Sequence, residues 1–264
     1  MKPSIASEDA AAPVGAGSQT LMRGLDVIEA VARDTLTLSE LAERLNLTKS
    51  TTHRLASALV DRGYVAFTPR EGYRLGSKLL ELGSLARGQV DLIQIARPHI
   101  ERLAAATDDT VHLGILDDDH ALYLDKIPGR RRITISSRVG DRQPLTSTGL
   151  GKALILDHPA SYWATRFEAD RAHGGAAADP EVWQRRMAGY VDAGRAFDLE
   201  ENEDQIRCVA APIRDAEGGI VGAISVSSAA QYMSDDRMGT LSDDVRATAA
   251  AISHDLGWTG PDET

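Results

Sequence analysis

Residues 37–63 have the sequence TLSELAERLNLTKSTTHRLASALVDRG, and this stretch decides the fold of the N-terminal part of the chain. Thr37 precedes Glu40 by three residues, the spacing of a capping box, so a short helix is expected to begin there. Asn46 and Leu47 predict a tight turn, and Thr48 is placed to cap a second helix that ends at Gly63. A short helix, a turn and a second helix form a helix-turn-helix, whose second helix enters the major groove of DNA.

The first turns of that second helix hold the candidate DNA contacts. Side chains at the N-terminal end of a recognition helix reach base edges first, and an arginine one turn later can meet a phosphate or a guanine edge. The predicted contacts are Lys49, Ser50, Thr51, His53 and Arg54. The opposite stripe, which we expect to face the interior, holds Leu55, Ala58, Leu59 and the aliphatic stem of Arg62.

The segments on either side of this motif complete a winged domain. Leu21, Leu25, Ile28 and Ala32 recur at helical spacing and predict a preceding helix. Residues 64–67 and 73–75 predict a two-stranded wing around the turn at 69–72, with Arg70 at the tip as a further DNA contact. The alternative is a three-helix protein-interaction module whose charges are merely solvated.

Charge and composition are compatible with a DNA-binding domain on an acidic body. Residues 20–75 hold eight Lys or Arg and seven Asp or Glu, a net charge of +1, so the acidic excess behind the overall charge of −10 lies outside this segment. The length of 264 residues favours two domains, and an apolar share of 42% with 26% charged residues is typical of a globular protein in water. No apolar run approaches the roughly 18 residues of a membrane span, and a single cysteine indicates a reducing cytoplasm.

The rest of the chain predicts an α+β domain. Residues 77–87 and 92–106 are expected to be helices joined near Gly88, which form either a connector for dimerisation or plain core helices. Strands are expected at 111–117, 121–127, 132–139, 208–214 and 219–228, with helices after Gly151 and over 182–194 and 241–256. The basic run at 130–132 is expected to be a solvated rim. The predicted division is a flexible tail at 1–19, a winged helix-turn-helix at 20–76, a linker helix at 77–91, an antiparallel-sheet domain at 92–258 and a tail at 259–264.

Three motifs together resemble the IclR family of bacterial regulators over about residues 20–258. They are LSELAERLNLTKSTTHRLASALVDRGYV, PLTSTGLGKALI and IRCVAAPIRDAEGGIVGAISVSS. The resemblance implies a winged head, a linker helix and a GAF-like sensor domain, in a homodimer or tetramer that binds an operator in double-stranded DNA. It implies no cofactor beyond a small organic-acid effector. VDLIQ, TVHLGILDDD, SSRVGDRQPLTSTGLGK and ENEDQIRC look most similar to the KdgR-like branch, which responds to sugar acids such as 2-keto-3-deoxygluconate.

The family pocket, carried over to matching positions, implies a polar site for a keto or sugar acid. The backbone N–H groups of Gly149 and Leu150 precede a helix, whose positive end favours a carboxylate. Asp198 suits hydroxyl groups, and Cys208, Ser225 and Ser227 complete the site, the two serines on one face of a strand. Taken singly, each of these residues is also compatible with a purely structural role. His112 fits either a ligand contact or a core position.

The functional prediction is a transcription regulator, a repressor of a sugar-acid operon that its effector releases. One alternative is an activator of aromatic or other carboxylate catabolism. Another is a hydrolase with Cys208 as nucleophile, but no histidine can be placed beside Cys208 from sequence, and a winged head has no role in such an enzyme. A metal sensor is disfavoured because no His or Cys cluster has ligand spacing. We therefore expect no enzyme activity.

Overall fold

The computed structural model describes residues 16–132, 135–172 and 179–260. The chain divides into two compact units, the first ending at Gln89 and the second beginning at Val90, and each is described by itself. The predicted tails fall largely outside the described residues, at 1–15 and 261–264. The first helix nevertheless begins at Ala16, so the predicted N-terminal tail extends too far.

The first unit is built on three helices: α1 (Ala16–Ala30), α2 (Leu38–Arg44) and α3 (Lys49–Asp61). The capping box is confirmed, because the Thr37 N–H donates to the Glu40 carboxylate over 2.8 Å and the Glu40 N–H donates back to the Thr37 hydroxyl. Thr48 caps α3 by accepting from the Thr51 N–H. These caps satisfy N–H groups that a helix start leaves without partners.

The inner face of α3 differs from the predicted stripe. Thr52, Leu55 and Ala56 are buried and Leu59 packs against the core, whereas Ala58 is exposed. Positions 52, 55, 56 and 59 follow the i, i+3, i+4, i+7 spacing of a single helix face, and position 58 lies off that face. The prediction for Ala58 is therefore wrong, as is that for the stem of Arg62, which is exposed at the C-cap of α3.

The wing forms from β1 (Val65–Thr68) and β2 (Gly72–Leu75), which pair antiparallel. Arg70 lies at the tip with a φ of 74°. Gly72 is required where the wing meets the helices, since a Cβ there would lie 2.3 Å from the Leu36 carbonyl oxygen. α4 (Ser77–Gln89) follows and buries no residue; Leu80 and Leu85 are 78% and 57% exposed.

The second unit contains five helices, one short 3-10 helix and six strands within the described residues. They are α5 (Leu92–Thr107), β3 (Thr110–Asp117), β4 (His120–Ile127), β5 (Arg142–Pro144), α6 (Gly149–Leu154), α7 (Ala160–Ala172), α8 (Pro180–Ala193), β6 (Ala196–Leu199), β7 (Ile206–Arg214), β8 (Ile220–Ala229), η1 (Ala230–Tyr232) and α9 (Asp235–Asp255). α5 begins after Asp91, whose carboxylate accepts from the N–H groups of Ile93 and Gln94. The break between α4 and α5 is thus set by this cap rather than by Gly88, which lies inside α4.

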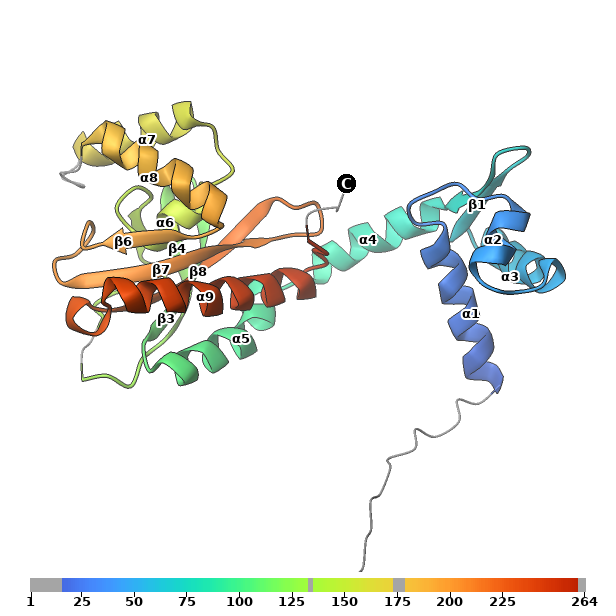
Figure 1. The fold of residues 1–264 in the computed structure, drawn as a ribbon, viewed down its shortest axis with the longest axis horizontal. Coiled ribbons are helices and arrows are strands. Elements are labelled where there is room, and N and C mark those ends of the chain that lie inside the picture. The colour runs from blue at the N-terminus through green and yellow to red at the C-terminus, as the bar shows by residue number, and fades with distance from the viewer. Residues whose placement is uncertain (1–15, 133–134, 173–178, 261–264) are drawn as a thin grey trace, which may run out of the picture. The chain divides into compact units, whose positions relative to one another are not determined.

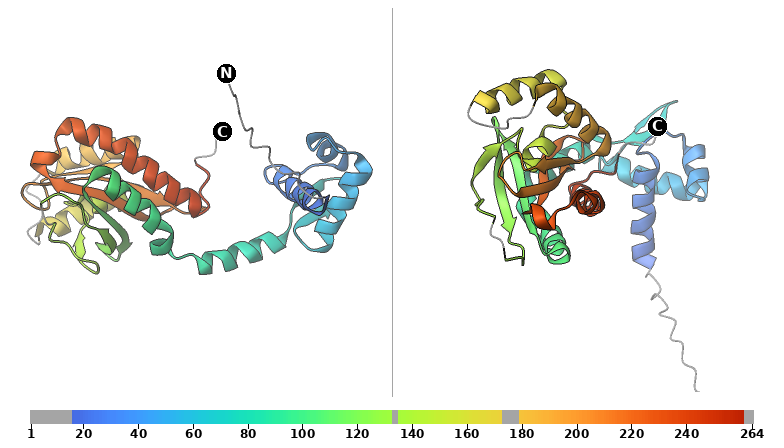
Figure 2. Two further views of the ribbon diagram at one scale, coloured as in Figure 1. Left: turned by 90° about the horizontal axis from the view of Figure 1, so that it is seen from below. Right: turned by 60° about the vertical axis from the view of Figure 1, so that its left-hand side comes forward.

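The six strands form one antiparallel sheet in the order β5-β4-β3-β8-β7-β6. α5 and α9 cover one face, and α6, α7 and α8 cover the other (Figure 1; Figure 2 shows α5 in green beside α9 in red). Alternation along β8 divides its side chains between the two faces, because Ile224 and Val226 join the core under α9 while Ser225 and Ser227 point to the α6 side. The fold is therefore α+β, as predicted.

The predicted strand at 132–139 is wrong for the residues that the structure describes. Residues 135–139 form no strand, and Ile133 and Thr134 lie outside the described residues. The carbonyl groups of Ile135 and Ser137 accept from the Lys126 ammonium at 2.7 and 2.6 Å, so a side chain satisfies them in place of a neighbouring strand. β5 takes the edge position beside β4 instead.

Arg131 also departs from prediction, since it is not part of a solvated rim. Its guanidinium donates to the buried Asp109 carboxylate over 2.6 Å and lies over the Tyr232 ring. Asp109 is held in addition by Arg237 and by the Ser228 hydroxyl. A buried carboxylate needs such partners to offset its desolvation, which gives Arg131 a structural role.

Candidate functional site

The leading end of α3 is exposed in the first unit. Lys49, Ser50, His53 and Arg54 are all exposed, and Thr51 is half-buried. The Ser50 and Thr51 hydroxyls lie 3.2 and 2.9 Å from the Thr48 hydroxyl, so the cap holds them in place. These five predicted contacts lie at the N-terminal end of one helix whose other face is buried, which is the arrangement that major-groove insertion requires.

The wing tip supplies a second exposed cation. Arg70 is exposed on the turn between β1 and β2, beyond the end of the wing pairing at Thr68 and Gly72. An arginine at the tip of a wing can reach phosphates beside the groove occupied by the recognition helix. All six predicted DNA-binding residues are thus exposed or half-exposed on the first unit.

A cavity of about 630 Å³ lies on the α6 face of the sheet in the second unit. This volume falls within the roughly 300–1,000 Å³ typical of small-molecule sites. The structure brings all six predicted effector-binding residues to its walls: Gly149, Leu150, Asp198, Cys208, Ser225 and Ser227. They come from four elements, α6, β6, β7 and β8, so only the folded sheet places them together.

The first turn of α6 offers backbone donors to this cavity. Thr148 caps the helix by accepting from the Gly151 N–H at 3.0 Å, and the Lys152 N–H donates to the Thr148 carbonyl. The N–H groups of Gly149 and Leu150 are those for which the helix itself supplies no acceptor. A side chain at position 149 would crowd Cys208 and Asp198, since its Cβ would lie 3.2 Å from the Cys208 Cβ. Glycine therefore keeps the helix start close to the sheet.

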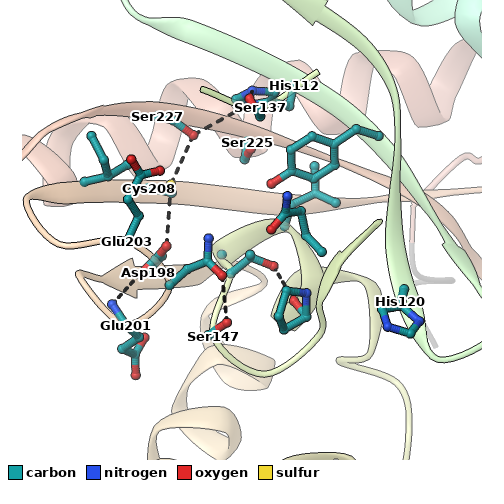
Figure 3. A pocket seen from close by; sticks show the side chains of 18 of the residues that line it. His112, His120, Ser137, Ser147, Asp198, Glu201, Glu203, Cys208, Ser225 and Ser227 are labelled. Atoms are coloured by element: carbon teal, nitrogen blue, oxygen red, sulfur yellow. Dashed lines mark hydrogen bonds between the residues drawn. The ribbon is translucent and has the colours of Figure 1, made fainter. Parts of the chain in front are cut away.

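A row of polar side chains crosses the sheet beneath the cavity (Figure 3). Asp198 faces Cys208 across the β6–β7 pair, and the Cys208 sulfur lies 3.0 Å from the Ser227 hydroxyl of β8. Ser227 lies 3.5 Å from His112 Nδ1 on β3, and His112 Nε2 is 2.7 Å from the Ser137 hydroxyl. The row links four adjacent strands to the segment that follows β4.

Burial sets the charge of the titratable groups in this row. It raises the pKa of Asp198 to about 6, against the opposing effects of Lys152 and of the Glu201 N–H that donates to the carboxylate. Burial also raises the pKa of the Cys208 thiol, and it lowers the pKa of His112 to about 3, helped by the charge of Lys126. At neutral pH Cys208 is a thiol and His112 is an uncharged imidazole.

The wall beside Asp198 is fixed by a buried lysine. Lys152 is 1% exposed, donates to the Phe197 carbonyl over 2.9 Å and forms an ion pair with Glu201. Arg186 lies 3.3 Å from the second Glu201 oxygen. Because a buried ammonium requires a partner, Lys152 ties α6 to the turn after β6 and holds the two walls at a fixed separation.

Sequence reasoning missed several residues of the cavity. His112 was left open between two roles, and the structure places it on the cavity wall. Ser137, Asn202 and Arg166 were not predicted at all, although they also line the cavity. Alternation along β3 was the available signal for His112, whereas the others depend on loops and on α7, which no clear pattern predicts.

The geometry gives Cys208 no means of acting as a nucleophile. Its thiol is buried, its raised pKa disfavours the thiolate, and its hydrogen-bond partners are the Ser227 hydroxyl and the Asp198 carboxylate, whose negative charge disfavours the thiolate further. Across residues 16–132, 135–172 and 179–260, no group of three or more His, Cys, Asp or Glu side chains is placed to hold a metal ion. In the same described ranges, no helix combines the length and apolar character needed to cross a membrane.

A winged helix-turn-helix and a separate domain with a polar ligand cavity define the class of ligand-responsive DNA-binding transcription regulators. The chain belongs to the IclR family. Residues 20–69 match the IclR helix-turn-helix domain, and residues 85–254 match the bacterial transcriptional regulator IclR C-terminal domain. The chain is accordingly a transcription regulator of this family and not an enzyme.

Similar proteins support this assignment along nearly the full chain. The DNA-binding transcriptional repressor YiaJ of Escherichia coli is 33% identical over 257 residues, covering 94% of this chain and 91% of YiaJ. The transcriptional regulator KdgR of the same organism is 32% identical over 236 residues, covering 84% and 86%. The crystal structure of Pseudomonas aeruginosa HmgR shares the fold with a TM-score of 0.81 at 23% identity, covering 92% of this chain and all of HmgR. Near-equal identity to YiaJ and KdgR leaves the branch within the family unresolved.

Proposed function

We propose that this regulator is a repressor of an operon for sugar-acid catabolism and that a keto or sugar acid, 2-keto-3-deoxygluconate or a relative of it, releases it from DNA. The observation that supports an acid effector most strongly is the cavity of the second unit, which gathers all six polar groups predicted for such a ligand. Repression is supported by the similarity to YiaJ, which is described as a repressor. The protein would act in the cytoplasm, where its operator is.

The chemistry of the cavity supplies a place for each part of such an acid. A carboxylate fits against the N–H groups of Gly149 and Leu150, where amide dipoles favour a negative charge. Hydroxyl or keto oxygens fit beside Asp198, Ser225 and Ser227, which together offer acceptors and donors. An apolar ligand would leave these groups without partners, at a cost in affinity.

We propose that DNA is bound by a homodimer, or by a tetramer of two such pairs, with one α3 in each half-site. Half-sites of a dimeric helix-turn-helix protein lie about one helical turn apart or a multiple of it. Effector binding then changes operator affinity by stabilising a head spacing that fits the two half-sites less well. Coupling of this kind is typically worth about 1–3 kcal/mol.

A thermal-shift screen of sugar and keto acids, followed by gel shifts on the promoter upstream of the protein's own gene, tests this proposal. Arg54→Ala is expected to weaken operator binding by about tenfold or more and to leave the effector-induced thermal shift unchanged. Ser225→Ala is expected to reduce the thermal shift and to keep operator binding. Arg62→Ala, at the opposite end of α3, and Ser242→Ala, a buried serine of α9 outside the cavity, are the matched controls.

Two results would contradict the proposal. An acid that binds tightly and leaves operator affinity unchanged would refute the coupling between cavity and DNA. A ligand that tightens operator binding would refute effector-released repression.

A further inference from the structure

The cavity walls are rich in carboxylates and poor in cations. Five acidic residues line the cavity, whereas Arg166 is the single arginine or lysine among the lining residues that the structure describes; the acids are Asp119, Asp170, Asp198, Glu201 and Glu203. Glu201 is neutralised by Lys152 and Arg186, but those two cations are outside the lining. The charge that the walls present to a ligand therefore depends on whether the positive charge of Arg166 is already paired with a protein carboxylate.

The cavity has two chemically different ends. At one end, α6 begins with Gly149 beside Cys208 and Asp198. At the other end lies the turn between β3 and β4, where His120 pairs with Pro144 of β5 and Asp119 precedes it. Figure 3 shows His120 on the far side of the pocket from Asp198 and Cys208. A ligand whose carboxylate is held by the amides of α6 extends its other end toward this turn.

Arg166 of α7 lies at this second end, and its charge is already compensated. It forms an ion pair with Asp119, and its buried Nε–H has no acceptor in the described structure. Asp170, one turn later on α7, lines the cavity too and accepts from the N–H and hydroxyl of Thr146 at 3.0 and 2.7 Å. Asp119 and Asp170 together outweigh the single cation, so the second end has an excess of negative charge.

We propose that the Asp119–Arg166 ion pair makes this cavity select acids with one carboxylate and a neutral, hydroxylated far end over acids with a carboxylate at both ends. The inference rests on the proposed function, because it assumes that the first carboxylate binds at α6. A terminal hydroxyl can donate to Asp119 or Asp170, whereas a second carboxylate meets like charge, and the charge of Arg166 is already compensated by Asp119. The preferred class is thus the aldonic and keto-aldonic acids, and the aldaric acids are rejected.

Isothermal titration calorimetry with two matched pairs of acids tests this selection. D-gluconate and D-glucarate differ only at C6, as do D-galactonate and D-galactarate, so each pair isolates the second carboxylate. The wild-type protein is expected to bind the monoacid of at least one pair about tenfold or more tightly than the diacid. Asp119→Asn removes the carboxylate that pairs with Arg166. It is expected to lower the ratio of the diacid to the monoacid dissociation constant about three- to tenfold, mainly through tighter diacid binding.

Asp118→Asn is the matched control. Asp118 lies in the same turn outside the cavity lining, and its φ of 50° is one that asparagine tolerates. This variant removes the same formal charge and is expected to keep the wild-type preference. Circular dichroism of both variants checks that the turn substitution leaves the fold intact.

The outcomes separate this inference from the proposed function. Equal binding of monoacid and diacid in both pairs by the wild type, or an unchanged preference in Asp119→Asn, overturns the selection by the ion pair and leaves an acid effector standing. An equal loss of preference in Asp118→Asn also overturns it, since the effect would then be one of general charge. A protein that binds neither monoacid overturns the selection for aldonic acids, and one that also binds no acid of the thermal-shift screen overturns the proposed function as well.

Discussion

The carboxylate of Asp198 is buried, and burial disfavours its charged form. The residue is 2% exposed, and its pKa rises from 3.8 to about 6. Between these two pH values the folded protein binds more protons at this site than the unfolded chain does. Stability from this group is therefore present at low pH and is lost as the pH rises through that window.

Asp198→Asn is expected to remove this pH dependence, because the amide keeps the shape and carries no charge. Urea unfolding gives the free energy of unfolding of both proteins at pH 4 and pH 7. The difference, variant minus wild type, should be about 2 kcal/mol larger at pH 7 than at pH 4. Asp244→Asn, on an exposed position of α9, should show no such gain. A wild type and an Asp198→Asn variant with parallel pH profiles would contradict the assignment of the raised pKa to Asp198.

Sequence patterns predicted some residues of the cavity and missed others. Ser225 and Ser227 were predictable as neighbours because side chains two apart on a strand share a face. The family resemblance supplied all six predicted cavity residues, and the predicted helix after Gly151 gives a physical reason for Gly149 and Leu150. Arg166 could not be predicted, since its place in the cavity depends on how α7 packs over the sheet.

At the scale of elements, local chemistry predicted the helix starts better than it predicted the weaker strands. The caps at Thr37 and Thr48 act within three residues, so the sequence contains all of their determinants. β6 is four residues long, and the predicted strand at 132–139 gave way to a segment held by Lys126. Whether such a short segment forms a strand depends on contacts with residues distant in the sequence, and a local sequence pattern does not reveal those contacts.

Thr48→Ala is expected to lower the stability of the first unit by about 1 kcal/mol, because the N–H of Thr51 loses its acceptor. The same substitution also frees the hydroxyls of Ser50 and Thr51 and should weaken operator binding severalfold. Hydrogen exchange of the α3 amides and gel shifts measure the two effects. Thr35→Ala, an exposed threonine outside the helices, is the control, and an equal effect there would refute the role of the cap.

At the scale of the whole molecule, α4 is an element that buries none of its described residues within a single chain. Among its described residues none is buried, and Leu80, Leu82 and Leu85 are 78%, 38% and 57% exposed. Exposed apolar stripes of this kind are typical of protein–protein contacts. Their position after the winged head supports the proposed dimer, in which two such helices cover each other.

A Leu80→Ser, Leu85→Ser double variant is expected to raise the dissociation constant of the dimer by about tenfold or more, because each leucine loses apolar burial. Sedimentation velocity over a concentration series measures this constant. Val191→Ser, which changes an exposed apolar residue of α8, should leave it unchanged. An unaltered constant in the double variant would remove α4 from the interface.

The alternation of side chains along β8 has a consequence for how such regulators diversify. Ser225 and Ser227 face the cavity, while Ile224 and Val226, their immediate neighbours in sequence, pack beneath α9. Ligand contacts and core packing thus depend on alternate residues of the same short strand, and no residue of these four serves both. Randomising only the serine positions, and keeping the isoleucine and valine, should yield many well-folded proteins with new ligand preferences, whereas the reverse library should yield few.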